Sequence, residues 1–288
     1  NLDQIQIGAK YWVYVVANSS AEATTFSQIG NVKTLLALRQ QDHNLHLTAT
    51  GLQNVSSHFL MDGVGYMGNS EPAYAGPVVI AQSKITDVVE LNVKLRRAAS
   101  KIVVKLLSGE DMQFDATIAN STHGYYIRNL PYSTRVVNDG NIRECVDLET
   151  THETTSPYSK WLYDDNNKVI GLEITAYVYS HKWETNNSFE TATNLLVDIP
   201  ARYTNDQDQV VELPNNYYQV PLSQRFEFER NHYYEVTAHV NAPGAEDFSE
   251  PVEVQDLKYS AYPWTEEIIN VGGENGPEYL KVNLDFLK

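Results

Sequence analysis

The sequence has few of the features that mark disulfide-bonded, membrane-spanning or catalytic proteins. Its single cysteine, Cys145, allows no disulfide within the chain, and its polar surroundings without a partner histidine do not favour a catalytic thiol. No apolar run approaches the ~20 residues of a membrane-spanning helix, and the longest, such as 11–17, have the length of a strand. The motifs G-x-S-x-G, G-x-G-x-x-G and H-E-x-x-H and the phosphate-binding loop are absent, so we predict a protein that is not an enzyme.

Positive charge is also scarce. The chain carries 21 lysines and arginines against 37 aspartates and glutamates, which gives a formal net charge of −16 and a pI near 4.8. An acidic surface of this size repels phosphate backbones and anionic headgroups. Nucleic acids and anionic membrane surfaces are therefore not expected as partners.

Residues that bind metals are present but not grouped. His43 and His46 are three positions apart, and in an alternating strand this spacing places them on opposite faces, which disfavours a zinc site. The acidic segments 164–167 and 205–208 offer oxygen ligands for Ca²⁺, but neither has an EF-hand pattern, and ordinary acidic turns explain them better. We predict no cofactor.

What the sequence does contain is a succession of short strand patterns. Apolar residues make up 42% of 288 residues, and alternating segments rich in tyrosine and β-branched residues are separated by turn-forming residues. This pattern predicts an all-β protein built as two β-sandwiches. The best helix candidate is 26–40, although Gly30 weakens it. A polar stretch with little periodicity at 138–160 places the boundary between domains 1–138 and 139–288.

Between 90 and 106 the apolar residues alternate, but their parity changes half way. The first row is Leu91, Val93 and Leu95, and the second row is Ile102, Val104 and Leu106. Because side chains in a strand alternate with period two, the buried face must turn over across 96–101. We predict one strand with a bulge, whose halves serve two sheets or two neighbouring strands, and the small Ala98 and Ala99 permit the close approach at its corner. The alternative is two strands joined by a tight turn, which is poorly supported because 94–106 has no glycine, proline, asparagine or aspartate.

Aromatic residues gather in the second half, where Trp161, Tyr163 and Trp183 lie among further tyrosines. Exposed aromatic rings bind sugars by stacking, so these three residues are a candidate sugar platform. Cross-strand pairing and core filling are commoner reasons for such residues.

The end of the chain has the pattern of a detachable strand. Glycines at 272–273 and Gly276-Pro277 make a flexible joint, and beyond it one row of apolar residues comprises Leu280, Val282, Leu284 and Phe286. Burying this row is worth roughly 6–12 kcal/mol before ordering costs, so it must dock somewhere. One option is its own second domain, and the other is a groove on a neighbouring subunit, by β-strand addition.

The beginning of the chain gives a reason to consider the second option. Residues 5–18 form a strong strand pattern close to Asn1. If a leader ending before Asn1 is removed, the first sandwich lacks a strand, and its open edge would accept the tail of another molecule. Head-to-tail contacts of this kind do not close, and they produce filaments.

Several segments, in this order, resemble the fimbrillins, the subunits of type V pili on Gram-negative Bacteroides-type bacteria. They are VYVVAN at 13–18 followed by FSQIGNVKTLLAL, HFLMDG at 58–63, VELNVKLRRAASKIVVKL at 89–106, IRNLPYST at 127–134 and RNHYYEVTAHV at 230–240. The third is the best match, because the family has an L-x-R-x-x-(A/S)-K-I-x-V type strand there. The matching framework positions are Leu91, Val93, Leu95, Arg97, Lys101, Ile102 and Val104.

The resemblance implies two transthyretin-like Greek-key β-sandwich domains in tandem, with a short helix in the first. It further implies export as a lipoprotein precursor to the outer membrane surface, removal of a leader strand by a protease, and head-to-tail polymerisation by donor-strand exchange with other copies or related subunits. By analogy the donor is Glu278–Lys288, and Asp256–Trp264 is a second candidate segment.

Three functional hypotheses follow. The leading one is a structural fimbrial subunit that supports adhesion and biofilm formation and contacts host or bacterial surface ligands. The second is a sugar-binding adhesin, at a pilus tip or as a free surface lectin, that uses Trp161, Tyr163 and Trp183. The third is a hydrolase on a β-sandwich, although nothing in the sequence singles out a pair of catalytic carboxylates among the 37 acidic residues.

Overall fold

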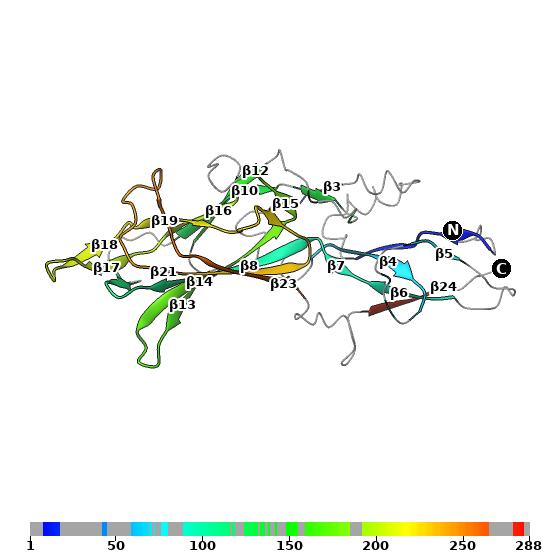
Figure 1. The fold of residues 1–288 in the computed structure, drawn as a ribbon, viewed down its shortest axis with the longest axis horizontal. Helices are drawn as coiled ribbons and strands as arrows, with labels where there is room; N and C mark the ends of the chain where they lie inside the picture. The colour runs from blue at the N-terminus through cyan, green and yellow to red at the C-terminus, as the bar shows by residue number, and fades with distance from the viewer. Residues whose placement is uncertain are drawn as a thin grey trace.

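All regular elements in the described part of the protein are strands (Figure 1). The computed structural model describes residues 8–17, 42–44, 59–68, 70, 72, 76–79, 89–115, 117–118, 124–131, 133–135, 138, 142, 148–154, 159–184, 192–264 and 279–284. The all-β prediction is confirmed for these residues. The predicted helix at 26–40 lies outside them, and none of them forms a helix long and apolar enough to cross a membrane.

Two five-stranded sheets face each other and form what we call the main sandwich. The first sheet has the order β13 (Ser159–Tyr163), β14 (Val169–Tyr179), β8 (Ala99–Ser108), β21 (His232–Val240) and β23 (Lys258–Pro263). The second has the order β12 (Leu148–Thr154), β10 (Gly124–Pro131), β16 (Asn194–Asp198), β19 (Tyr217–Pro221) and β22 (Val252–Glu253). Alternate residues of both sheets point inward to one continuous core, which makes this a β-sandwich.

The alternation of apolar residues explains which face of each strand is buried. In β14 the alternate residues Ile174, Ala176 and Val178 form an inward row that is at most 2% exposed. In β21 the inward row, Tyr234, Val236, Ala238 and Val240, is at most 8% exposed. The central β8 runs antiparallel to β14 and parallel to β21, so it has a partner on each side.

Five further strands form what we call the end sheet, with the order β2 (Tyr14–Ala17), β4 (Met61–Tyr66), β6 (Val89–Lys94) and β24 (Tyr279–Leu284), and with β7 (Arg96–Arg97) paired to β4. Figure 1 shows β4, β6 and β24 toward one end of the elongated molecule, while β17 and β18 lie toward the other. The smaller sheets are β18 (Val210–Leu213), β17 (Ala201–Thr204) and β9 (Met112–Phe114); β1 (Lys10–Tyr11) with β5 (Val78–Val79); β3 (Asp42–Asn44) with β11 (Ser133–Arg135); and β15 (His181–Lys182) with β20 (Glu227–Phe228).

The sheets of the main sandwich run across residue 138. Strands β8 and β10 precede it, and their partners β14, β21 and β16 follow it. The division into domains 1–138 and 139–288 stays a prediction, and in the described residues both sides of this position share one core.

The sequence of 224–244 predicts a hairpin, with Phe226 and Phe228 before a turn at Arg230–His232 and an alternating row from Tyr234 after it, but the segment pairs differently. The turn at Arg230–His232 is present, and Asn231 adopts a positive φ of 56° there. However, β20 pairs with β15, and β21 pairs with β8 and β23. The long β21 gains more pairing inside the five-stranded sheet than the two-residue β20 offers, so the prediction of a hairpin is wrong.

The predicted change of face between 90 and 106 is the passage from the end sheet to the main sandwich. Strands β6 and β7 pair with β4 in one unbroken register, in which Asn92 lies opposite Tyr66 and Arg97 opposite Met61. The amide of Ala98 still donates to the carbonyl of Leu60, at 2.8 Å, and from Ala99 onward the chain pairs with β14. One extended segment therefore changes partner at the two alanines and serves two sheets, as predicted.

Candidate functional site

The candidate site is the outer edge of β6, where the end of the chain forms the last strand of the end sheet. β24 pairs antiparallel with β6 over its whole length, from Tyr279 opposite Lys94 to Leu284 opposite Val89. Figure 1 shows β24 beside β6. The terminal strand is thus bound to the first half of its own chain. The sequence left two positions open, the second domain of its own chain and a neighbouring subunit, and this position is neither of them.

The register of this pair agrees with the hydrophobic pattern of both strands. Leu280 lies opposite Val93, Val282 opposite Leu91, and Leu284 opposite Val89. Opposite positions of an antiparallel pair belong to the same face of the sheet, and a slip by one residue would exchange the two faces. The predicted donor row therefore occupies the register positions that face the apolar row of β6. The fourth predicted residue, Phe286, lies outside the described residues.

On its other side β6 is held closely to β4. An ideal Cβ on Gly63 would stand 2.5 Å from the carbonyl oxygen of Lys94 and 2.8 Å from a Val93 methyl group. Any larger residue at this position would push the two strands apart. Leu91 and Val93 are completely buried, so the inward row of β6 belongs to a packed core.

The predicted framework residues fall into two groups in the structure. Leu91 and Val93 belong to β6, whereas Ile102 and Val104 are at most 2% exposed in the core of the main sandwich. Leu95 and Lys101 are half-buried. Arg97, between the groups, is only 2% exposed, which is unusual for an arginine.

Two contacts hold the buried Arg97, one to Asn231 in the neighbouring turn and one to Trp264. Its Nη1 donates to the carbonyl oxygen of Trp264 at 3.2 Å, and its backbone amide donates to Oδ1 of Asn231 at 3.2 Å. The guanidinium also lies over the Trp264 ring, 4.4 Å from its centroid, in a cation–π contact.

Trp264 is the centre of a second, smaller core between the end sheet and the main sandwich. This junction cluster comprises Phe59, Leu60, Ala98, Ala99, Tyr179 and Trp264. The Trp264 ring stacks on Tyr177 at 5.8 Å and meets the edge of Phe59 at 5.2 Å. Its amide donates to the carbonyl of Asn231 at 2.7 Å. The chain is therefore fixed at Trp264, immediately before residues 265–278 lead to β24.

A buried ion pair crosses the same junction. Asp62 of β4 lies 3.0 Å from Nη2 of Arg230, and their side chains are 5% and 8% exposed. Burial raises the pKa of Asp62, while Arg230, the amide of Asn138 at 2.7 Å and Arg96 oppose that shift. The 3.0 Å contact places the two side chains within ion-pair distance across the junction.

The three aromatic residues of the predicted sugar platform do not share an exposed face. Trp183 is only 6% exposed and lies in the main core, with its ring 5.4 Å from Phe228. Trp161 is half-buried and packs against the same core. Tyr163 alone is well exposed, at 52%.

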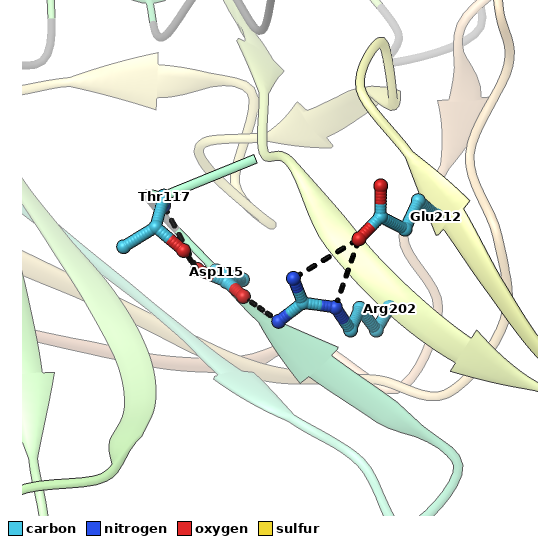
Figure 2. A network of polar contacts seen from close by, with 4 residues as sticks. All are labelled: Asp115, Thr117, Arg202 and Glu212. Carbon is cyan, nitrogen blue, oxygen red and sulfur yellow. Dashed lines mark hydrogen bonds and ion pairs between the residues drawn. The ribbon is translucent and has the colours of Figure 1, made fainter. Parts of the chain in front are cut away.

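Polar groups in the described residues are arranged to stabilise structure. No group of three potential metal ligands occurs there. The strongest surface network joins Arg202 of β17 to Asp115 and, through Oε1 at 3.0 and 3.2 Å, to Glu212 of β18, while Thr117 donates to Asp115 (Figure 2). It connects the β17–β18 hairpin to the end of β9. Cys145 lies outside the described residues.

Sequence reasoning missed the junction residues Asp62, Arg230 and Trp264. A signal for Asp62 was available, because a lone aspartate inside the apolar segment 59–66 implies a buried charge that needs a partner. Nothing in the sequence indicates that this partner is Arg230, since the two residues are far apart along the chain.

Comparisons with known proteins give a fold but no sequence family. No protein-family model and no curated protein sequence matches the chain. Among solved structures, one from Parabacteroides distasonis, named for cell adhesion, has a TM-score of 0.53 and 16% identity, over 89% of this chain and 84% of that one.

Two further neighbours also come from Bacteroidales. The tip fimbrial protein Mfa3 of Porphyromonas gingivalis, with a C-terminal truncation, has a TM-score of 0.45 and 11% identity, over 88% of this chain and 80% of that one. A protein of Bacteroides eggerthii, named for cell adhesion, has a TM-score of 0.45 and 16% identity, over 89% and 78%. The likeness to the Parabacteroides protein establishes a shared β-sandwich fold.

Proposed function

We propose that the chain is a structural, non-enzymatic subunit of a surface fimbria, which polymerises head to tail by donor-strand exchange. The observation that carries this proposal is the pairing of β24 with the edge of β6, in a register that matches two apolar rows. An edge that accepts one such strand accepts the same strand from another copy equally well, because β-strand addition uses backbone hydrogen bonds and a row of apolar positions.

The shared fold supports an extracellular role of this kind. The neighbour with the higher TM-score is named for cell adhesion. In this proposal the partners are other copies or related pilin subunits and a protease that processes the precursor. The protein is exported as a lipoprotein precursor and works on the outer membrane surface.

The rival proposal, a sugar-binding adhesin, has less support. Stacking on a sugar needs an exposed ring, and of the three candidate residues Trp183 is buried and Trp161 packs on the core. A glycan array with wild type and Tyr163→Ala tests what remains of it, because specific binding that Tyr163→Ala removes would favour the adhesin.

Polymerisation is tested by changing the apolar row of the tail. We expect deletion of 278–288 to leave a folded protein that no longer forms ladders resistant to mild detergent. Val282→Asp should have the same effect, because it places a charge in the apolar row. Asn283→Asp adds the same residue at the adjacent position of the other row and should keep the ladders. Ladders that persist after the deletion would show that another segment is the donor.

A further inference from the structure

We propose that in the free monomer the C-terminal strand caps the edge of β6 of its own chain, so that assembly requires this strand to be displaced. The exchange step rests on the proposed function, whereas the capped monomer rests on the fold alone. In this state the donor strand pairs with the acceptor edge of its own chain. Neither the strand nor the edge is then available to another copy, and we call this form the closed monomer.

The edge of β6 is the part of the end sheet that needs a cap. One side of β6 is paired with β4, and its close approach there is fixed by Gly63. The other side carries β24. Without β24, the unpaired backbone groups of β6 would be a template for strands of other molecules. The completely buried Leu91 and Val93 lie at register positions opposite the tail, so removing the tail opens the sheet directly beside an apolar row.

The attachment point of the tail is compatible with pairing to β6 of its own chain and with pairing to β6 of another copy. Trp264 is 3% exposed and held by Arg97 and Asn231, so the chain is fixed up to this residue. The link 265–278 spans at most about 50 Å when it is fully extended. Its sequence contains glycines at 272–273 and 276. The strand can therefore leave its own β6 and reach another copy while its root stays in the junction cluster.

Covalent linkage favours the closed form in dilute solution. A strand joined covalently to its own acceptor edge meets that edge at an effective concentration on the order of millimolar, whereas a strand of another copy is present only at the protein concentration. Exchange must also break a ladder of six residue pairs before a new one is complete. We therefore expect closed monomers at micromolar concentration and slow conversion to chains as concentration rises.

Disulfide trapping tests the closed monomer. Asn92 lies opposite Lys281, and opposite Cα atoms of an antiparallel pair are about 4.5–5.5 Å apart, within the range of a disulfide. The test variant is Asn92→Cys with Lys281→Cys, in a Cys145→Ser background. The matched control is Asn92→Cys with Asn283→Cys, which loses the same Asn92 side chain but is two positions out of register. Circular dichroism and a thermal melt of the reduced proteins check that both fold.

The expected result is loss of both free thiols in the dilute monomer of the in-register pair and retention of the thiols in the control. The oxidised monomer should form no ladders, and reduction should restore them. Free thiols in the in-register variant at a concentration where only monomers exist would overturn the proposal.

A mixing experiment separates this proposal from the proposed function. Protein with only Asn92→Cys is mixed at high concentration with protein that has only Lys281→Cys, both without Cys145. A disulfide between copies in this mixture, together with free thiols in the dilute double variant, would support the proposed function and refute the closed monomer. An oxidised dilute double variant, together with no disulfide in the mixture, would support the closed monomer and refute exchange through this edge.

Hydrogen exchange gives an independent measurement on the unmodified chain. In the dilute monomer, the amides of 279–284 that bond to β6 should be protected. Deletion of 278–288 should increase exchange in β6 while the core strands β8 and β14 stay protected. Rapid exchange of 279–284 in the intact monomer would contradict the proposal.

Discussion

His181 shows how a single buried residue makes the stability of this protein depend on pH. The ring lies in the main core beside Trp183 and Phe228 and is 1% exposed. Its Nδ1 donates to the carbonyl of Tyr179 at 2.9 Å, and its Nε2 lies 2.5 Å from Oγ1 of Thr193. Burial lowers the pKa of His181 from 6.5 to about 4, so the folded protein holds this ring neutral.

We expect the free energy of unfolding to fall as the pH falls from about 6.5 to about 4. In this pH window His181 is protonated in the unfolded chain but stays neutral in the folded protein. The loss of free energy of unfolding levels off below the pKa of the folded state. Each pKa unit corresponds to about 1.4 kcal/mol, so the loss from this group is about 3 kcal/mol.

Urea unfolding of wild type and His181→Phe at pH 7 and pH 4.5 measures this effect. The difference between the two proteins should change with pH by most of that amount, because phenylalanine does not titrate. His239→Gln, at an exposed position of β21, is the control for the loss of a histidine side chain. An equal pH dependence in wild type and His181→Phe would rule out this explanation.

At the scale of elements, a charge network reinforces the attachment of the β17–β18 hairpin, whose Tyr203 and Leu213 pack against the main core. Val210 and Val211 of β18 are 62% and 42% exposed, so they contribute little packing. Arg202 joins the buried Asp115 on one side and the exposed Glu212 on the other (Figure 2).

The two carboxylates of this network should differ in their importance. Asp115→Ala removes a side chain that is 11% exposed and accepts from Arg202 and Thr117, and we expect a loss of roughly 1–3 kcal/mol. Glu212→Ala removes a carboxylate side chain that is 58% exposed. Its loss should cost less, because exposed ion pairs typically contribute less than about 1 kcal/mol. Chemical denaturation of the two variants compares them, and equal losses would contradict this assignment.

The sequence predicted individual strands better than their pairing. The inward rows of β14 and β21 follow from alternation, and so does the change of face between Val93 and Ile102, because each depends only on neighbouring residues. The partners depend on contacts between distant residues, and for this reason the 224–244 hairpin was predicted wrongly. Alternation also failed to distinguish buried from exposed aromatic residues, as the buried Trp183 and Tyr179 show.

At the scale of the whole molecule, the junction cluster and the Asp62–Arg230 pair connect the end sheet to the main sandwich. We expect Asp62→Ala to leave a buried guanidinium without its carboxylate and to cost about 3–5 kcal/mol. Because this contact joins the two parts, calorimetry should show the end sheet unfolding in a separate transition below that of the main sandwich.

The control for this prediction is Asp165→Ala, which removes an exposed aspartate in the turn after β13 and should melt like wild type. A single transition in Asp62→Ala, at the temperature of wild type, would show that the ion pair does not couple the two parts.

The central position of β8 has a consequence for how the chain folds as it is made. Its parallel neighbour β21 begins at His232, far along the sequence, and its other neighbour β14 begins at Val169. Pairings between distant segments form slowly, because a large loop must close before any contact is gained. The strand that links the two parts of the molecule therefore stays without either sheet neighbour until most of the polypeptide has been synthesised. During that interval its apolar residues lack the neighbours that bury them, which makes the growing chain prone to aggregation.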